Sequence, residues 1–96
     1  MQIYITDEAV DWLIDELDLE DGDQVRFFPK YGGNSEFQQG FSVGMGLETA
    51  PSPETTVEKK KITFQIDEKD AWFFDGSDLQ VDCENDEVTF HKKEAE

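Results

Sequence analysis

The sequence predicts a compact α+β domain with mainly antiparallel, curved β-sheets and two short helices. Short segments with alternating apolar residues recur along the chain, as at Ile62, Phe64 and Ile66, and such alternation is typical of half-buried strands. Turn residues such as Asp75-Gly76 separate these segments. A segment near the N-terminus has instead the period of an amphipathic helix. With 96 residues the chain has room for one domain, over residues 1–96.

The first predicted elements are a strand over Gln2–Ile5 and a helix that ends near residue 17. Thr6 is suited to cap the helix, because its hydroxyl can accept a backbone N–H of the first turn. One stripe about 100° wide holds the apolar side chains of the helix, Val10, Leu13, Ile14 and Leu17. Trp12 falls outside this stripe. Its indole either packs at the helix flank against the first strand or lies on a contact surface.

Two strands around a glycine turn are predicted in the next part of the chain. The first strand begins at Val25, and Pro29 within it indicates an edge or a bulge. After Gly32-Gly33 the second strand has an apolar side, made by Phe37, Phe41, Val43, Met45 and Leu47. Its other side has almost no side chains, since Gly40, Ser42, Gly44 and Gly46 occupy it. We expect Trp72 or Phe74 to pack on that smooth face, which places Trp72 in the core.

The second half of the chain reads as three more strands and a short helix. Residues 48–55 contain two prolines and are expected to form a loop. Asp67 is suited to cap the short helix, which runs through Phe73. Two alternating segments then form a hairpin with a turn at Glu84–Glu87, and their inward side chains are Leu79, Val81, Cys83, Val88 and Phe90. In total about six strands are expected.

The charge of the chain excludes several classes of partner. With 24 acidic and 8 basic residues the formal net charge is −16, so nucleic acid and anionic membrane are not expected partners. A basic protein surface or cations fit this charge better. No window approaches the ~20 apolar residues of a membrane span. Cys83 is the only cysteine, and the chain starts without a basic segment followed by an apolar one, so we expect a cytoplasmic protein.

Few residues suggest chemistry, and we expect no enzyme activity, no metal site and no cofactor. The sequence has no nucleophile elbow, phosphate-binding loop, paired metal-binding histidines or Cys-x-x-Cys. His91 is expected at the surface, and Cys83 as a buried, inert thiol. Acidic groups could hold a hard divalent cation, either Asp75 with Asp78 or Asp82 with Glu84 and Asp86, but no calcium-loop pattern is complete.

Three segments together resemble a known family. They read IYITDEAVDWLIDEL, VRFFPKYGGNSEFQQGFSVGMGL and ITFQIDEKDAWFFDGSDLQVD. In this order and spacing they are similar to the HesB-like family, the A-type carriers of iron–sulfur assembly, and to its cysteine-poor HesB/YneR-type branch. The carriers ligate a cluster with one cysteine after the glycine turn and a Cys-Gly-Cys near the C-terminus. Here Asn34 stands at the first position and the end of the chain has no thiol.

The resemblance implies a non-catalytic protein that binds another protein, an accessory factor related to iron–sulfur assembly that lacks the cluster-ligating cysteines. Its expected site is the loop at the family's first ligand position, made by Tyr31, Gly32, Gly33, Asn34, Ser35 and Phe37. This loop reads as a tight hairpin, or as an anion-binding nest, which the net charge opposes. Alternative functions are a carboxylate-based binder of iron or divalent metal and an uncharacterised enzyme. Carriers of this type form dimers or tetramers, so the resemblance also allows a homodimer.

Overall fold

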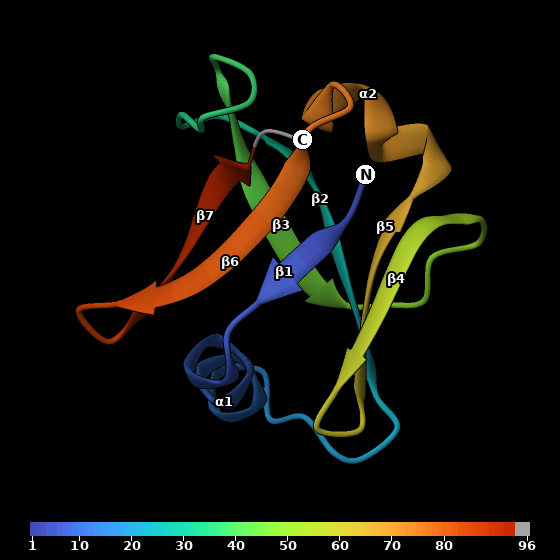
Figure 1. The fold of residues 1–96 in the computed structure, drawn as a ribbon, viewed down its shortest axis with the longest axis vertical. Helices are drawn as coiled ribbons and strands as arrows, with labels where there is room; N and C mark the ends of the chain where they lie inside the picture. The colour runs from blue at the N-terminus through green and yellow to red at the C-terminus, as the bar shows by residue number, and fades with distance from the viewer. Residues whose placement is uncertain (94–96) are drawn as a thin grey trace.

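The computed structural model describes residues 1–93 and confirms the predicted α+β class. In these residues seven strands form two mixed sheets, with two short α-helices and one turn of 3-10 helix beside them (Figure 1). Three of the five strand pairings are antiparallel and two are parallel, so the sheets are mainly antiparallel, as expected.

The smaller sheet joins the two ends of the chain. Its order is β1 (Ile3–Ile5), β6 (Asp78–Glu84) and β7 (Glu87–Lys93), with β1 parallel to β6 and β6 antiparallel to β7. The carboxylate of Asp78 accepts the backbone N–H of Gln2 at 2.8 Å, which fixes the start of β1 beside β6. Strands β6 and β7 pair as far as Glu84 and Glu87, which confirms the predicted hairpin and its turn.

The larger sheet has the order β3 (Phe41–Leu47), β2 (Gln24–Tyr31), β5 (Ile62–Asp67) and β4 (Pro53–Lys59). Strand β2 pairs with β5 only over Gln24–Phe27, but with β3 along its whole length to Tyr31. Beyond Phe27 it therefore has a neighbour on one side only. Pro29 lies in this part, which confirms the predicted edge position.

The helices begin at the caps that the sequence predicts. Helix α1 (Asp7–Glu16) starts after Thr6, whose hydroxyl accepts the N–H of Ala9 at 3.1 Å. Asp67 caps the 3-10 turn η1 (Glu68–Asp70), which continues into α2 (Ala71–Phe74). The indole of Trp12 is half-buried and donates to the backbone carbonyl of Asp86 at 2.6 Å. Trp12 thus packs at the helix flank, where it is bonded to the β6–β7 turn.

The core lies between the two sheets and beneath α1. Phe27 of β2 stacks on Phe64 of β5, and its ring centroid lies 5.7 Å from that of Phe90 on β7, across the gap between the sheets. Fully buried side chains come from both sheets and both helices, including Val10, Leu13, Phe27, Phe64, Phe73, Phe74, Leu79 and Val81. The inward direction of the β6 apolar residues is confirmed, although Cys83 is only partly buried.

Trp72 contradicts its predicted place in the core. Its side chain is 54% exposed, while the adjacent Phe73 and Phe74 are fully buried. The smooth face of β3 is covered instead by Phe28, the residue directly opposite Gly44 on β2. A one-turn helix cannot bury three consecutive aromatic side chains on one side, and here the first of them points outward.

A second correction concerns residues 48–55. Pro53 already belongs to β4, whose pairing with β5 shifts register between Pro53 and Thr55. The strand was not predicted because it lies at the edge of the sheet and its side chains are exposed or half-buried. It is held by backbone pairing to β5, and no run of apolar side chains marks it in the sequence.

Candidate functional site

The predicted site loop is larger than a tight hairpin. It connects β2 to β3 through residues 32–40, and the N–H of Gly32 donates to the carbonyl of Gly40 at 2.9 Å. Inside it the Ser35 hydroxyl accepts the N–H groups of Phe37 and Gln38, each at 3.2 Å. These bonds close the loop on itself, and Asn34 remains exposed at its surface.

The two aromatic residues of this loop region point in opposite directions. Phe37 packs inward, with its ring centroid 5.0 Å from that of Phe74 and 5.5 Å from that of Phe73. Tyr31 points outward and is 88% exposed. Phe37 therefore anchors the loop to the core, while Tyr31 is free to contact another molecule.

Tyr31 is the first member of an aromatic row that also contains Phe41 and Trp72. The ring centroids of Tyr31 and Phe41 lie 5.7 Å apart, and those of Phe41 and Trp72 also lie 5.7 Å apart, both pairs edge to face. Trp72 in turn contacts the buried Phe73. The row connects the end of β2 with α2, although its outer members are 41 residues apart in the sequence. Trp72, predicted to lie in the core, is a surface residue in the structure.

A polar cluster around His91 fastens the loop to β7. His91 Nδ1 lies 2.8 Å from a carboxylate oxygen of Glu36, and its Nε2 lies 3.0 Å from Glu84. The other oxygen of Glu36 accepts the backbone N–H of Lys92 at 2.9 Å. Hydrogen bonds to Glu36 and Glu84 raise the pKa of His91 above its usual value of 6.5. His91 is thus a partly buried member of a network and not the simple surface residue that was predicted.

The same cluster contains a set of side chains, found among the described residues, that could hold a metal ion. Asp82, Glu84 and His91 each offer a ligand atom, and these atoms lie within 4.8 Å of one another. Both ring nitrogens of His91 already face carboxylates, so the imidazole would have to lose a proton before it could ligate a metal. In the other suggested pair, Asp78 is buried and one of its carboxylate oxygens accepts the backbone N–H of Gln2, whereas Asp75 is exposed.

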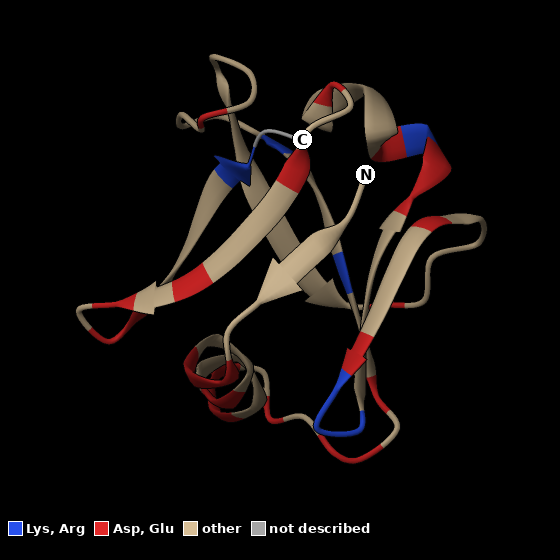
Figure 2. Ribbon diagram, viewed as in Figure 1, with Lys and Arg blue, Asp and Glu red and all other residues tan. Residues whose placement is uncertain are grey.

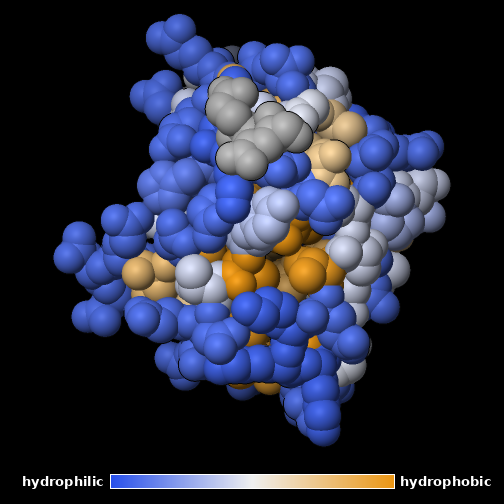
Figure 3. Space-filling view, viewed as in Figure 1, coloured by the Kyte–Doolittle hydropathy of each residue, from blue (hydrophilic) through white to orange (hydrophobic). Residues whose placement is uncertain are grey.

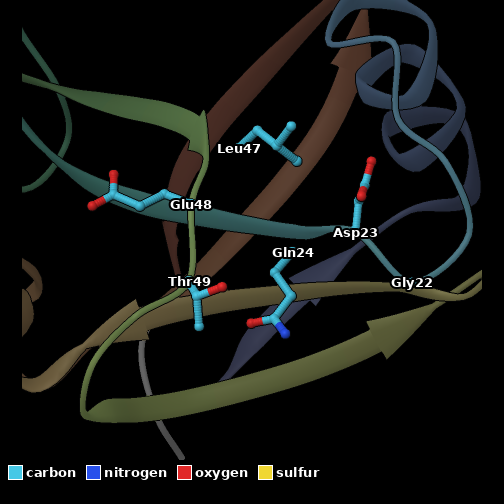
Figure 4. A pocket seen from close by; sticks show the side chains of 6 residues that line it. All are labelled: Gly22, Asp23, Gln24, Leu47, Glu48 and Thr49. Atoms are coloured by element: carbon cyan, nitrogen blue, oxygen red, sulfur yellow. The ribbon is translucent and has the colours of Figure 1, made fainter.

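Two features outside the His91 cluster bear on catalysis, the Cys83 thiol and a surface hollow. Burial, with smaller contributions from Glu8 and Asp86, raises the pKa of the Cys83 thiol, so this cysteine is a poor nucleophile. A shallow hollow of about 230 Å³ is lined by Gly22, Asp23, Gln24, Leu47, Glu48 and Thr49 (Figure 4). In that view Glu48 points away from Asp23 and Gln24, so the two carboxylates of the hollow do not face each other.

Acidic residues are spread over much of the molecule (Figure 2). A group of lysines at the β4–β5 turn is neutralised locally, because Lys59 pairs with Asp7 at 3.0 Å and Lys60 with Asp11 at 2.8 Å. Figure 3 shows that one face is largely hydrophilic, with apolar surface mainly in its middle. No helix among residues 1–93 is both long and apolar enough to span a membrane.

Several bacterial proteins are similar to this chain in sequence. One relative, 46% identical over 86 residues that make up 90% of each chain, is the pyruvate dehydrogenase inhibitor of Bacillus subtilis (strain 168). The chain belongs to the family of this inhibitor. Uncharacterized proteins of Staphylococcus haemolyticus and Staphylococcus aureus (strain MRSA252) are 33% and 35% identical. These matches cover 96% and 97% of this chain and 98% and 100% of the relatives. No family model and no solved structure matches.

These findings overturn the resemblance to the HesB-like family and its HesB/YneR-type branch. No family model supports it, and the named member of the inhibitor family carries no iron–sulfur name. The expected role as an accessory factor related to iron–sulfur assembly was therefore wrong, and the metal-binding alternative is not retained. The resemblance depended on a strand, glycine turn and strand pattern, which small α+β domains share for reasons of backbone geometry. Asn34 had already replaced the residue specific to the carriers.

Proposed function

We propose that this chain is a non-catalytic regulatory protein that inhibits pyruvate dehydrogenase by binding to it. The observation that carries this proposal is the 46% identity to the Bacillus subtilis inhibitor, which extends over 90% of both chains. The match covers 86 residues and leaves about a tenth of each chain outside it. We therefore expect the two chains to share a fold and a mode of action over the matched residues, as one domain.

The site geometry supports binding over catalysis. His91 is held between carboxylates, and the pKa of Cys83 is raised, so neither is placed to act as an activated base or nucleophile. An inhibitor that acts by binding needs neither group. It needs an exposed surface of fixed shape, and the region around the β2–β3 loop provides one.

We propose the β2–β3 loop as part of the contact with the enzyme. It contains the residues expected from the sequence, and the structure divides their roles: Phe37 anchors the loop, while Tyr31 and Asn34 are exposed. We place the interaction in the cytoplasm, where a lone thiol such as Cys83 stays reduced.

The test is inhibition of a purified enzyme. Pyruvate dehydrogenase from Bacillus subtilis is assayed for pyruvate oxidation while the concentration of the chain is raised. We expect a saturable loss of activity, and the Bacillus subtilis inhibitor serves as the reference. An unrelated protein of similar size and net charge controls for a general effect of acidic protein. Full activity at saturating concentrations of the chain, with the reference still inhibiting, would contradict the proposal.

A further inference from the structure

We propose that the aromatic row of Tyr31, Phe41 and Trp72 is the surface by which the chain docks, and that it enters an apolar pocket bordered by Lys and Arg side chains on the enzyme. This inference rests on the proposed function and specifies its contact. It adds Trp72 and Phe41, from α2 and β3, to the loop that the sequence suggested. It also specifies the chemistry of the partner.

The exposure of the row is the first argument. Large apolar side chains that are exposed in the described residues are Tyr4, Tyr31, Leu47 and Trp72. Two of these four flank Phe41 in one continuous contact. Exposed aromatic side chains gathered in one place are characteristic of protein interfaces, where Trp and Tyr contribute most of the binding energy. Of the other two exposed residues, Leu47 lies at the opposite end of the β2–β3 pair, and the ring of Tyr4 is covered on one side by the ammonium group of Lys93.

The rigidity of the row is the second argument. Tyr31 and Phe41 are directly paired across β2 and β3, so their backbones are fixed by the ladder. Trp72 is fixed by α2, whose next two residues are fully buried. The loop between the two strands is held on the inside by Phe37, which packs on Phe74. It is also held by Glu36, which is bonded to His91 of β7. A surface ordered in this way loses little conformational entropy when it binds.

The negative charge of the molecule is the argument for basic residues around the partner's pocket. A net charge of −16 produces a negative potential that extends beyond the nearest residues and repels acidic surfaces. The η1–α2 segment that carries Trp72 also has an exposed acidic residue at each end, Glu68 and Asp75. Lys30 and Lys69 lie near the row in sequence, but they do not offset the excess of the whole surface. A pocket with basic residues around an apolar centre complements both properties.

Three single variants test the surface. Tyr31→Ala and Trp72→Ala each remove an outer member of the row, and Leu47→Ala removes an exposed apolar side chain of the same sheet at its other end. Binding to Bacillus subtilis pyruvate dehydrogenase is measured by surface plasmon resonance. We expect the dissociation constant to rise at least about tenfold for each row variant, and by less than about twofold for Leu47→Ala. Circular dichroism melting of each variant shows whether it is folded at the temperature of the assay.

The experiment also measures how binding depends on salt and whether the chain associates with itself. The association rate of the unchanged chain should fall by about tenfold between low and high ionic strength, because steering by the basic border is screened. If the unchanged chain inhibits and binds but both row variants bind equally well, the docking surface is overturned and the proposed function stands. If the unchanged chain does not bind, both are overturned. If it forms a dimer by light scattering that Trp72→Ala abolishes, with enzyme binding unaffected, a second copy covers the row and the inference is wrong.

Discussion

His91 joins two distant parts of the chain through Glu36, its Nδ1 lying 2.8 Å from a carboxylate oxygen of that residue. The second ring nitrogen lies 3.0 Å from Glu84 and 4.0 Å from Asp82. A neutral imidazole has only one N–H, so it can donate to the carboxylate on one side only. Its other nitrogen then turns a lone pair toward the second carboxylate. The arrangement therefore favours the imidazolium form.

The first prediction is a pH dependence of stability centred on His91. The pKa of this imidazole is raised above 6.5 in the folded chain, so its stabilising contribution is complete below pH 6.5 and is lost as the pH rises through the raised pKa. Its partners Glu36 and Glu84 have pKa values lowered from 4.5, so their contributions are present above pH 4.5 and are lost as the pH falls through the lowered values. The cluster should be most stabilising between these limits. Urea unfolding at a series of pH values measures the effect.

The control for this prediction is His91→Asn, whose amide does not titrate. Between pH 6 and pH 8 the folding equilibrium constant of the parent chain should fall more than that of His91→Asn. The difference should be less than about fivefold, because the cluster is partly exposed. Other acidic groups titrate in both proteins, so the difference between the two curves isolates the imidazole. Parallel curves over this range would show that folding does not raise the pKa of His91.

The second prediction concerns the close approach of Phe28 to Gly44. A Cβ atom added at Gly44 would lie only 2.9 Å from Phe28 Cζ, and still closer to Phe28 Cε1. Gly44→Ala should therefore destabilise the fold by about 1–3 kcal/mol, because the ring must leave its position across β2 and β3. Denaturant unfolding measures the loss.

Gly46→Ala is the matched control on the same strand face. A Cβ atom there would lie 3.8 Å from the same ring, which is an ordinary contact. We expect a change below about 0.5 kcal/mol for this variant, as for other substitutions away from close contacts. Equal effects of the two alanines would show that strand propensity, and not the Phe28 ring, requires glycine on this face.

The third prediction tests the buried guanidinium of Arg26. This side chain bonds to Asp70 at 2.8 Å and to Glu48 at 2.9 Å, and of the two partners only Asp70 is buried. Asp70→Ala should cost about 3 kcal/mol in the free energy of unfolding, because it leaves a buried cation without its buried partner. Adding Arg26→Met should recover part of this loss, since the uncompensated charge is then gone.

Glu48→Gln provides the comparison for Arg26. Glu48 is 55% exposed, and removing an exposed partner should cost less than about 1 kcal/mol. If Asp70→Ala proves as mild as Glu48→Gln, water must reach the guanidinium in the variant, and the pair does not hold η1 against β2.

The elements that the sequence predicted are those with a local signal. Thr6 and Asp67 cap their helices because a capping bond spans only a few residues. Strand β5 and the β6–β7 hairpin have apolar alternation that the sequence displays directly. Strand β4 has no such pattern, so its place at the sheet edge depends on pairing with β5.

The candidate site depends on contacts between residues far apart in the chain. Phe28 could not be assigned to Gly44 without the β2–β3 register, which a loop over residues 32–40 leaves undetermined in the sequence. Glu36 and His91 are 55 residues apart. The direction of Trp72 depends on how one helical turn meets the sheets. The loop could thus be suggested from the sequence, whereas the aromatic row beside it and the polar cluster around His91 that holds it to β7 could not.

The last prediction uses the acidic residues of α1 to separate net charge from the helix dipole. Acidic groups occur at both ends of the helix, and its last turn has no basic residue. Glu16 therefore lies at the negative end, where a carboxylate is unfavourable. Glu16→Lys should raise the free energy of unfolding by about 0.5–1 kcal/mol, through the dipole and through reduced self-repulsion. Glu8→Lys changes the net charge equally but places a cation at the positive end, so its two effects oppose each other. We expect thermal unfolding at low ionic strength to rank Glu16→Lys above Glu8→Lys, and the difference to shrink in high salt because the dipole interaction is screened. Equal midpoints at low salt would mean that net charge alone limits the stability of this helix.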